Sequence, residues 1–123
     1  MRRAELVINY TMTSDRCLQN WILRDEGTNM DGSIFKAVFV PYAVNLALDD
    51  DTSDFVKKRI KTFLLDNAEA LWKNMDRGEY PAMYCNYYWG SMFPSNEIAS
   101  MGAQASGSSL MEGVARMMVT LEK

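Results

Sequence analysis

The connections between the helical segments constrain this chain more than any other feature of its sequence. Apolar residues recur at helical spacing over about 3–12, from 33 to the turn at 49–52, over 54–75 and over 95–121, so we expect four helices. Long segments, 13–32 and 76–94, join the outer pairs, whereas 49–52 is a tight turn. Since alternate connections of an antiparallel array fall at the same end, both long segments should share one rim. This long-short-long alternation favours a helical toroid over a four-helix bundle.

Each predicted helix has an expected inward face. Pro41 lies inside the second helix and predicts a kink or a disturbed turn near Ala37. The second helix is apolar on most sides, which favours burial on both faces. The expected inward residues are Leu6, Val7, Tyr10 and Thr11 in the first helix; Ile34, Val38, Tyr42 and Leu46 in the second; Val56, Ile60, Phe63, Leu64, Asn67, Ala68 and Leu71 in the third; and Ile98, Met101, Ala105, Leu110, Val114, Met117 and Leu121 in the fourth.

Capping residues and charge spacing support these helices. Asp31 or Ser33 is the expected N-cap of the second helix, Thr52 or Ser53 of the third, and Ser95 of the fourth. Glu69 and Lys73 form a favourable i,i+4 pair on the outer face of the third helix. Three glycines in the fourth helix, Gly102, Gly107 and Gly113, lower its helix propensity and are expected to mark close packing against a neighbour.

Length and charge limit the class of protein. The chain has 123 residues, enough for one domain over 1–123, and 48% apolar residues, enough for a core. Its net charge of −3 offers no basic face for nucleic acid. The longest apolar stretch, 34–48, is interrupted by polar residues and is too short to span a membrane. No signal peptide is seen, so we expect a cytoplasmic chain as written, or an export signal on a preceding part.

The absence of histidine limits the chemistry. It excludes a Ser-His-Asp or Cys-His nucleophile and a histidine-ligated metal within this chain. Cys17 and Cys85 form no CxxC motif and are expected to be reduced thiols; we expect no metal and no cofactor. Any acid/base groups would be carboxylates. Asp49, Asp50 and Asp51 lie on the short turn, away from the expected rim, and are interpreted as a solvated helix end.

The second long segment is rich in aromatic residues, and two interpretations of it stay open. It carries Tyr80, Tyr84, Tyr87, Tyr88, Trp89 and Phe93. Such rings stack on the C–H faces of sugars, while amides such as that of Asn86 bind hydroxyl groups; alternatively, the rings plug the end of the helical core. The first long segment carries Trp21, Asp25 and Glu26, for which a binding or structural role is favoured over a catalytic one. Lys36 is either a surface residue or a charge aimed into the cleft.

Several motifs together resemble glycoside hydrolase family 76, which contains endo-α-1,6-mannanases. The run 33–40, Ser-Ile-Phe-Lys-Ala-Val-Phe-Val, is similar to the FKGIF-type signature of that family, although Ala37 replaces the usual glycine and Pro41 replaces a basic or polar residue. Glu26 resembles an acidic residue before the signature. The segments 67–72, 87–90 and 104–107 resemble the NADSAW-type stretch, the aromatic-WSG loop and the TQASAL-type final helix, in the family order.

This resemblance implies an all-α fold made of helical hairpins of an (α/α)6 toroid, of which these helices would be the C-terminal part. It implies binding of a mannan-type oligosaccharide or polysaccharide, with the substrate-binding residues Glu26, Phe35, Lys36, Asn86, Tyr88, Trp89 and Gln104. Family members are typically secreted or on the cell surface.

The catalytic residues implied by the resemblance are an adjacent aspartate pair upstream of the signature, and no matching pair is present here. We therefore expect no catalytic residue in this chain and no hydrolysis by the isolated chain. Apolar helix faces left uncovered by a partial toroid predict a homo-oligomer. A non-catalytic carbohydrate-binding module and a helical self-association module are the alternatives.

Overall fold

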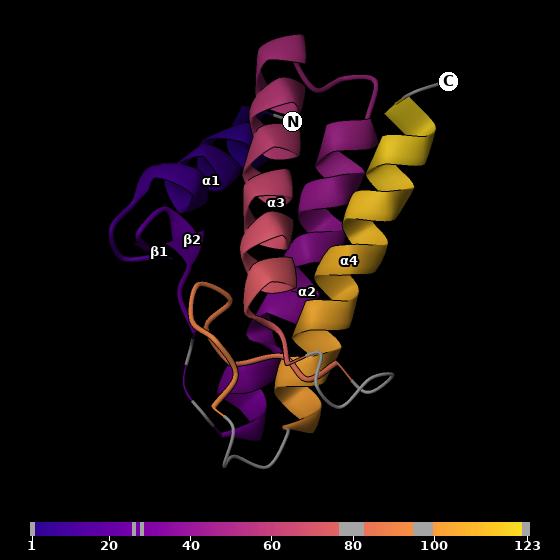
Figure 1. The fold of residues 1–123 in the computed structure, drawn as a ribbon. Helices are drawn as coiled ribbons and strands as arrows, with labels where there is room; N and C mark the ends of the chain where they lie inside the picture. Colours follow the sequence, from indigo (N-terminus) through magenta and orange to yellow (C-terminus); the bar gives the residue numbers. More distant parts are fainter. Residues whose placement is uncertain (1, 26, 28, 77–82, 95–99, 122–123) are drawn as a thin grey trace.

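The arrangement of the helices places both long connections at one end of the molecule. The computed structural model describes residues 2–25, 27, 29–76, 83–94 and 100–121. They form helices α1 (Arg2–Thr13), α2 (Met30–Leu48), α3 (Asp54–Asn74) and α4 (Met101–Leu121), and a small hairpin of β1 (Leu18–Gln19) and β2 (Ile22–Leu23). In Figure 1, α2 and α4 run upward side by side, α3 runs downward across them, and the α2–α3 turn lies at the opposite end from residues 83–94. The described parts of the two long segments meet where the Tyr88 hydroxyl donates to the carbonyl of Gln19, while the hairpin lies beside the middle of α3. The shared rim predicted for the long segments is therefore confirmed in part.

Helix α3 follows the sequence closely. Ser53 is its N-cap, and the Ser53 hydroxyl accepts a hydrogen bond from the backbone N–H of Val56 at 3.4 Å. The buried face consists of the predicted residues from Ile60 to Leu71, and Val56 is half-buried. The predicted Glu69–Lys73 ion pair is present at 3.2 Å, but both side chains are about two-thirds exposed, so it contributes only a few tenths of a kcal/mol.

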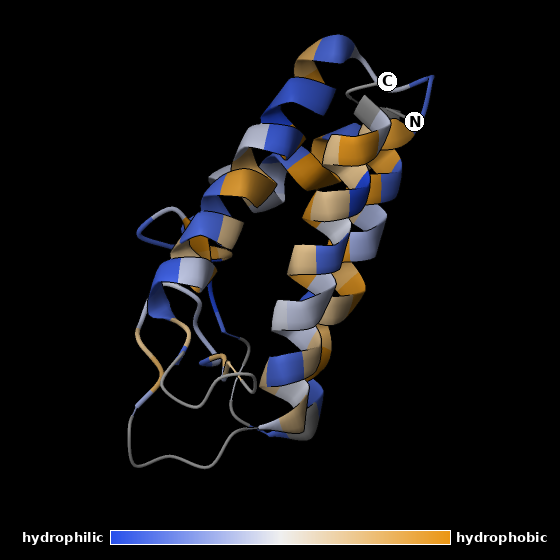
Figure 2. Cartoon of the chain, turned by 45° about the vertical axis from the view of Figure 1, so that its right-hand side comes forward, coloured by the Kyte–Doolittle hydropathy of each residue, from blue (hydrophilic) through white to orange (hydrophobic). Residues whose placement is uncertain are grey.

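The inward faces predicted for α1 and α2 are wrong for most of their residues, although Thr11 and Leu46 are half-buried as predicted. In α1, Leu6 and Val7 are 62% and 67% exposed, whereas Ile8 and Met12 are buried. In α2, Val38 and Tyr42 are exposed, and the buried apolar residues are small or β-branched: Val40, Ala43, Val44 and Ala47. Apolar residues lie on nearly every side of α2, whose visible part behind α4 is largely orange in Figure 2, so an apolar stripe alone does not fix which side of α2 faces the core. One side of α2 is solvent-exposed in this chain, contrary to the expected burial on both faces.

Two helix starts also differ from the prediction. The N-cap of α2 is Asn29, whose side-chain oxygen accepts from the backbone N–H of Gly32 at 2.7 Å. Helix α4 begins at Met101, with Ser100 outside the helix and accepting from Ala103 at 3.3 Å. The predicted cap Ser95 and inward residue Ile98 lie outside the described residues. Of the other inward residues predicted for α4, Leu110 and Met117 are fully buried, but Met101 is 77% exposed.

Small residues on α4 let it pack closely against α2. A Cβ atom at Gly102 would lie 1.9 Å from the Ser33 hydroxyl, and one at Gly113 would lie 2.8 Å from a methyl group of Val40. Between these glycines, Ser106 donates to the carbonyl of Ser33 at 2.6 Å and Ser109 donates to the carbonyl of Ala37 at 3.3 Å. We call Gly102, Ser106, Ser109 and Gly113 the α4 seam. The close packing predicted from the glycines is confirmed.

Ser109 also accounts for the tolerance of Pro41 within α2. Proline has no backbone N–H, so the carbonyl of Ala37, four residues earlier, loses its partner within the helix. The hydroxyl of Ser109 replaces that partner, and α2 continues as one helix from Met30 to Leu48. The predicted disturbance near Ala37 is a change of hydrogen-bond partner: the carbonyl of Ala37 accepts from Ser109 of α4. No described helix is both long enough and apolar enough to cross a membrane.

The hairpin of β1 and β2 was not predicted. Its turn has positive φ at both central residues, 51° at Asn20 and 67° at Trp21, as in a type I′ turn. Leu18 and Leu23 are buried, and the side-chain oxygen of the buried Asn67 accepts from the backbone N–H of Leu23 at 3.0 Å. The hairpin is thus fixed to α3.

Candidate functional site

Residues 83–94, which we call the rim loop, are tied to the ends of α3 and α4. Backbone hydrogen bonds pair Asp76 with Tyr84, at 2.8 and 3.1 Å. The Asn74 side chain donates to the carbonyl of Trp89 at 3.1 Å. From α4, the side-chain oxygen of Gln104 accepts from the backbone N–H of Cys85. The rim loop is therefore held by helix side chains along its length, which explains how a loop rich in aromatic residues keeps one conformation.

A lysine and a tryptophan form the centre of this site. Lys36, on the second turn of α2, is 6% exposed, and its ammonium nitrogen lies 3.9 Å from the ring centroid of Trp89. The same nitrogen donates to the carbonyl of Tyr87 at 2.7 Å. Trp89 is fully buried, and its indole N–H has no acceptor among the residues that the structure describes. A cation–π contact in so dry a place is stronger than at the surface, so Lys36 fixes the Trp89 ring.

Tyr88 and Asn86 use their polar groups within the protein. The Tyr88 hydroxyl donates to the carbonyl of Gln19, which joins the rim loop to the hairpin. Burial raises the pKa of Tyr88, and the nearby Arg24 cation opposes that rise. The Asn86 amide donates to the carbonyl of Met92 at 3.0 Å, and its oxygen accepts from the backbone N–H of Tyr87 at 2.8 Å.

The structure therefore brings most of the predicted site residues together. Lys36, Asn86, Tyr88, Trp89 and Gln104 all contact the rim loop or belong to it. Phe35 lies one residue before Lys36 and is 56% exposed. Glu26 lies outside the described residues. A substrate-binding role for these seven residues remains a prediction.

Some of the aromatic rings of the rim loop cover the end of the helical core. Trp89 and Tyr88 are buried, as is Cys85, which packs against the α4 glycine Gly107. Burial raises the pKa of the Cys85 thiol from 9.0 to about 11, and Lys36 opposes that rise. Sequence reasoning missed Cys85 and Asn74 as loop anchors, because neither carries a pattern that distinguishes it from an ordinary loop or helix residue.

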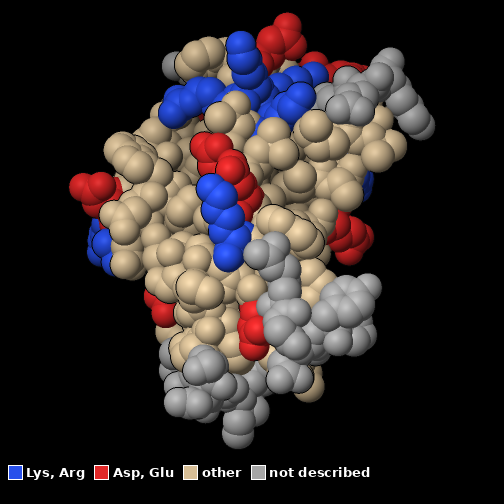
Figure 3. Space-filling model, viewed as in Figure 1, with Lys and Arg blue, Asp and Glu red and all other residues tan. Residues whose placement is uncertain are grey.

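The carboxylates that attracted attention in the sequence do not converge. The Asp49 side chain accepts from the backbone N–H of Asp51 at 2.8 Å in the short turn, at the end of the molecule opposite the rim loop. In Figure 3, Lys and Arg side chains gather toward the upper end, over the first half of α3. Among the described residues, no group of three Cys, Asp or Glu side chains is placed to hold a metal ion.

The helices match part of the α/α toroid fold of GH76A α-1,6-mannanase structures. The chain is similar to the GH76A α-1,6-mannanase of Salegentibacter sp. HEL1_6. It matches an inactive variant of that protein, with two adjacent aspartates replaced by alanine and α-1,6-mannotetrose bound, at a TM-score of 0.82 and 28% identity.

That match covers 94% of this chain and 32% of the mannanase chain, in its C-terminal portion. The structure of the mannanase without the replacements matches at a TM-score of 0.77 and 29% identity, over 89% of this chain and 30% of that one. This chain thus spans about a third of the length of the mannanase. Comparisons with protein-family models and with curated protein sequences found no match. The resemblance seen in the sequence and the predicted toroid fold are confirmed.

Proposed function

We propose that this chain is the C-terminal part of a glycoside hydrolase acting on α-1,6-linked mannan, and that it supplies one wall of the substrate cleft without the catalytic aspartate pair. The observation that carries the proposal is the match to an α-1,6-mannanase with α-1,6-mannotetrose bound, over nearly the whole of this chain. The rim loop and the start of α2 supply that wall: Phe35 exposes its ring to solvent, and Lys36 and Gln104 hold the rim loop in place.

The exposed ring of Phe35 gives a direct test. We expect the purified chain to bind α-1,6-mannotetrose in a titration followed by NMR. Replacing Phe35 with alanine removes a stacking surface and should weaken that binding about five- to tenfold, corresponding to roughly 1 kcal/mol. Val38→Ala is the matched control, because Val38 is equally exposed one turn later on the same helix. Equal affinities of the wild type and Phe35→Ala would contradict the proposal.

The absence of a catalytic pair gives a second test. The proposal predicts no cleavage of α-1,6-mannotetrose by the isolated chain, measured by chromatography of the products after prolonged incubation. Asp50 and Asp51 are adjacent but lie at the end opposite the rim loop. Any hydrolysis by the wild-type chain would contradict the proposal, and the Asp50→Asn, Asp51→Asn double variant would then show whether this pair or other carboxylates of the chain are catalytic.

An uncovered apolar surface supports self-association as an accompanying property. Leu6, Val7 and Tyr10 of α1 and Val38 and Tyr42 of α2 are all more than half exposed. Scattered apolar residues are ordinary on protein surfaces, but Val7 and Tyr42 line one groove between α1 and α2, and an exposed apolar groove is typical of an interface. We therefore propose that the isolated chain forms a homo-oligomer through this surface.

A further inference from the structure

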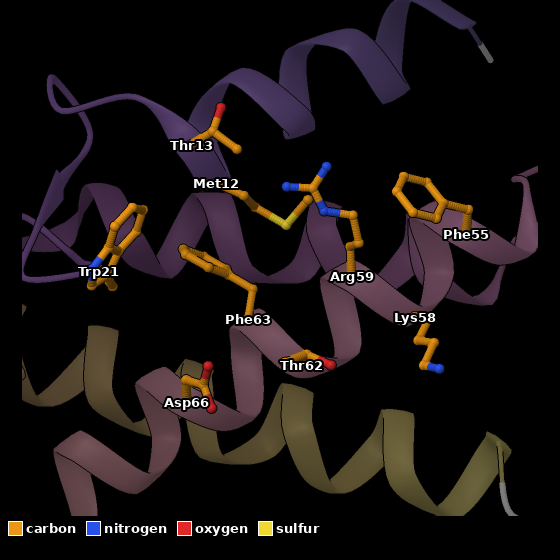
Figure 4. Close-up of a pocket in the computed structure, with 9 residues that line it drawn as sticks. All are labelled: Met12, Thr13, Trp21, Phe55, Lys58, Arg59, Thr62, Phe63 and Asp66. Atoms are coloured by element: carbon orange, nitrogen blue, oxygen red, sulfur yellow. The ribbon is translucent and has the colours of Figure 1, made fainter.

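We propose a second saccharide-binding site at the tip of the hairpin, centred on Trp21 and separate from the rim loop. Trp21 is 75% exposed, although it is the largest kind of side chain. It lines an open hollow of about 610 Å³ between the hairpin, the end of α1 and the first half of α3. In Figure 4, Phe63 points from α3 toward Trp21, and Met12 lies beside it at the end of α1. A hollow of this size is within the range of small-molecule sites.

The backbone at Trp21 carries the argument. Its φ of 67° lies in the left-handed region, which bulky residues rarely adopt. The preceding Asn20 has a φ of 51°, and a turn of this type favours Asn-Gly. A tryptophan here therefore lowers the stability of the fold, while the exposed indole makes little compensating contact with the core. Strained residues of this kind concentrate at functional sites, where ligand binding accounts for them.

The base of the hairpin is rigid, so the indole is held in a defined place. Asn67 of α3 accepts from Leu23, and Tyr88 of the rim loop donates to Gln19. The wall opposite is fixed too, because Arg59 donates to the side chain of Asn9 on α1. A preorganised site loses less conformational entropy on binding than a mobile one.

The lining of the hollow favours a sugar over a purely apolar ligand. Trp21 and Phe63 offer aromatic surface for the C–H faces of a sugar ring. Around them, Thr13, Thr62 and Asp66 offer hydroxyl and carboxylate groups for its hydroxyls. Lys58 and Arg59 line the hollow as well, so polar groups surround its aromatic surface and can bind sugar hydroxyls.

A second hollow lies between this site and the rim loop. It measures about 350 Å³, lies on the other side of the hairpin, and is lined by Asn20, Tyr88 and Gly90 among others. Asp66 lines both hollows, so they are neighbours along α3. A saccharide chain that leaves the rim at Gly90 can therefore continue past the hairpin to Trp21. The ligand class of the Trp21 site rests on the proposed function. The hollow at Trp21 is lined by none of the residues proposed to bind substrate at the rim.

The test uses Trp21→Gly, which separates strain from binding. Because glycine relieves the left-handed turn, the thermal midpoint of unfolding should rise by about 4 °C. The same change removes the stacking surface, so the affinity of the Trp21 site for α-1,6-mannotetrose should fall at least fivefold. Binding to this site is followed in both proteins by NMR through the backbone amide signals of Thr62 and Phe63, and in the wild type also through the indole N–H signal of Trp21, which is identified by its loss in the variant. Trp72→Ala, at a half-exposed tryptophan of α3, is the matched control and should leave the affinity of that site unchanged.

The outcomes distinguish the two sites. If the Trp21 indole signal of the wild type and of Phe35→Ala shifts equally with α-1,6-mannotetrose, the second site is supported even where the rim fails to bind. If the indole signal does not move while Phe35→Ala weakens binding, the proposed function stands and the second site is overturned. A midpoint that falls in Trp21→Gly would overturn the strain argument.

Discussion

The carbonyl oxygen of Ala37 accepts a hydrogen bond from a side chain of another helix. Ser109 donates to it at 3.3 Å, where Pro41 cannot. We expect Ser109→Ala to lower the free energy of unfolding by about 1 kcal/mol, because a partly buried carbonyl then loses the hydroxyl that donates to it. Urea denaturation measures this change.

Replacing Pro41 supplies the control. Pro41→Ala restores a backbone N–H four residues after Ala37, so the carbonyl regains a partner within α2. In that background, Ser109→Ala should cost less than half as much. Equal costs in the two backgrounds, measured as a double-mutant cycle, would show that the Ser109 hydroxyl does not compensate for the proline.

The thiol of Cys85 makes stability depend on pH on the alkaline side. Burial raises its pKa from 9.0 to about 11, so the folded state keeps the proton where the unfolded state has lost it. The stabilisation is complete below pH 9 and is lost as the pH rises toward 11. We expect the thermal midpoint to fall over this window and the fall to be smaller in Cys85→Ala. Cys17→Ala, at a half-buried cysteine, should keep the wild-type slope.

Tyr88 affects the same experiment in a predictable way. Burial raises its pKa above 10.0, so it also destabilises the folded state as the pH rises past that value. Both cysteine variants keep Tyr88, and only the difference between their slopes reports on Cys85. Identical slopes would contradict the assignment.

At the scale of elements, the α4 seam determines how closely α2 and α4 approach. Alanine in place of a helical glycine normally stabilises a helix by about 1 kcal/mol. At Gly113 the new Cβ would lie 2.8 Å from Val40 and 3.0 Å from Val44. We expect Gly113→Ala to destabilise the protein by about 1–3 kcal/mol in urea denaturation, because overpacking outweighs propensity. Ser108→Ala, on the exposed side of α4, should change stability by less than about 0.5 kcal/mol.

The elements differ in how far their sequence predicts them. In α3, charged residues occupy one side and apolar residues the other, so the cap and the buried face could both be predicted. In α2, apolar residues occupy nearly every side, and the core selects the side with Ala43 and Ala47, whose small size allows close approach. The hairpin could not be predicted, because Asn20-Trp21 is not a sequence that favours its turn. For the rim loop, composition predicted an aromatic site but could not predict that Lys36 would be buried against Trp89.

At the scale of the whole molecule, the apolar surface of α1 and α2 predicts the state of the isolated chain in solution. Val38 and Tyr42 are 55% and 72% exposed on one side of α2. We expect light scattering to give a mass above that of one chain at micromolar concentration. The double variant Val38→Lys, Tyr42→Lys should be monomeric, because each charge would have to be desolvated in the interface.

Val119→Lys is the control for that experiment, since Val119 is 61% exposed near the end of α4. It should associate as the wild type does. A monomeric wild type would contradict the proposed self-association, while the proposed saccharide sites would be unaffected.

The α4 seam has a consequence for the geometry of any ring that contains this chain. Helices α2 and α4 are neighbours that run in the same direction, and each belongs to a different helical hairpin. Their spacing therefore sets the angle by which one hairpin turns relative to the next. Glycines and serines along the contact keep α2 and α4 close over several turns, which favours strong curvature of the array. Larger residues at the same positions would increase the distance between α2 and α4, flatten the curvature and leave the ring unable to close on itself.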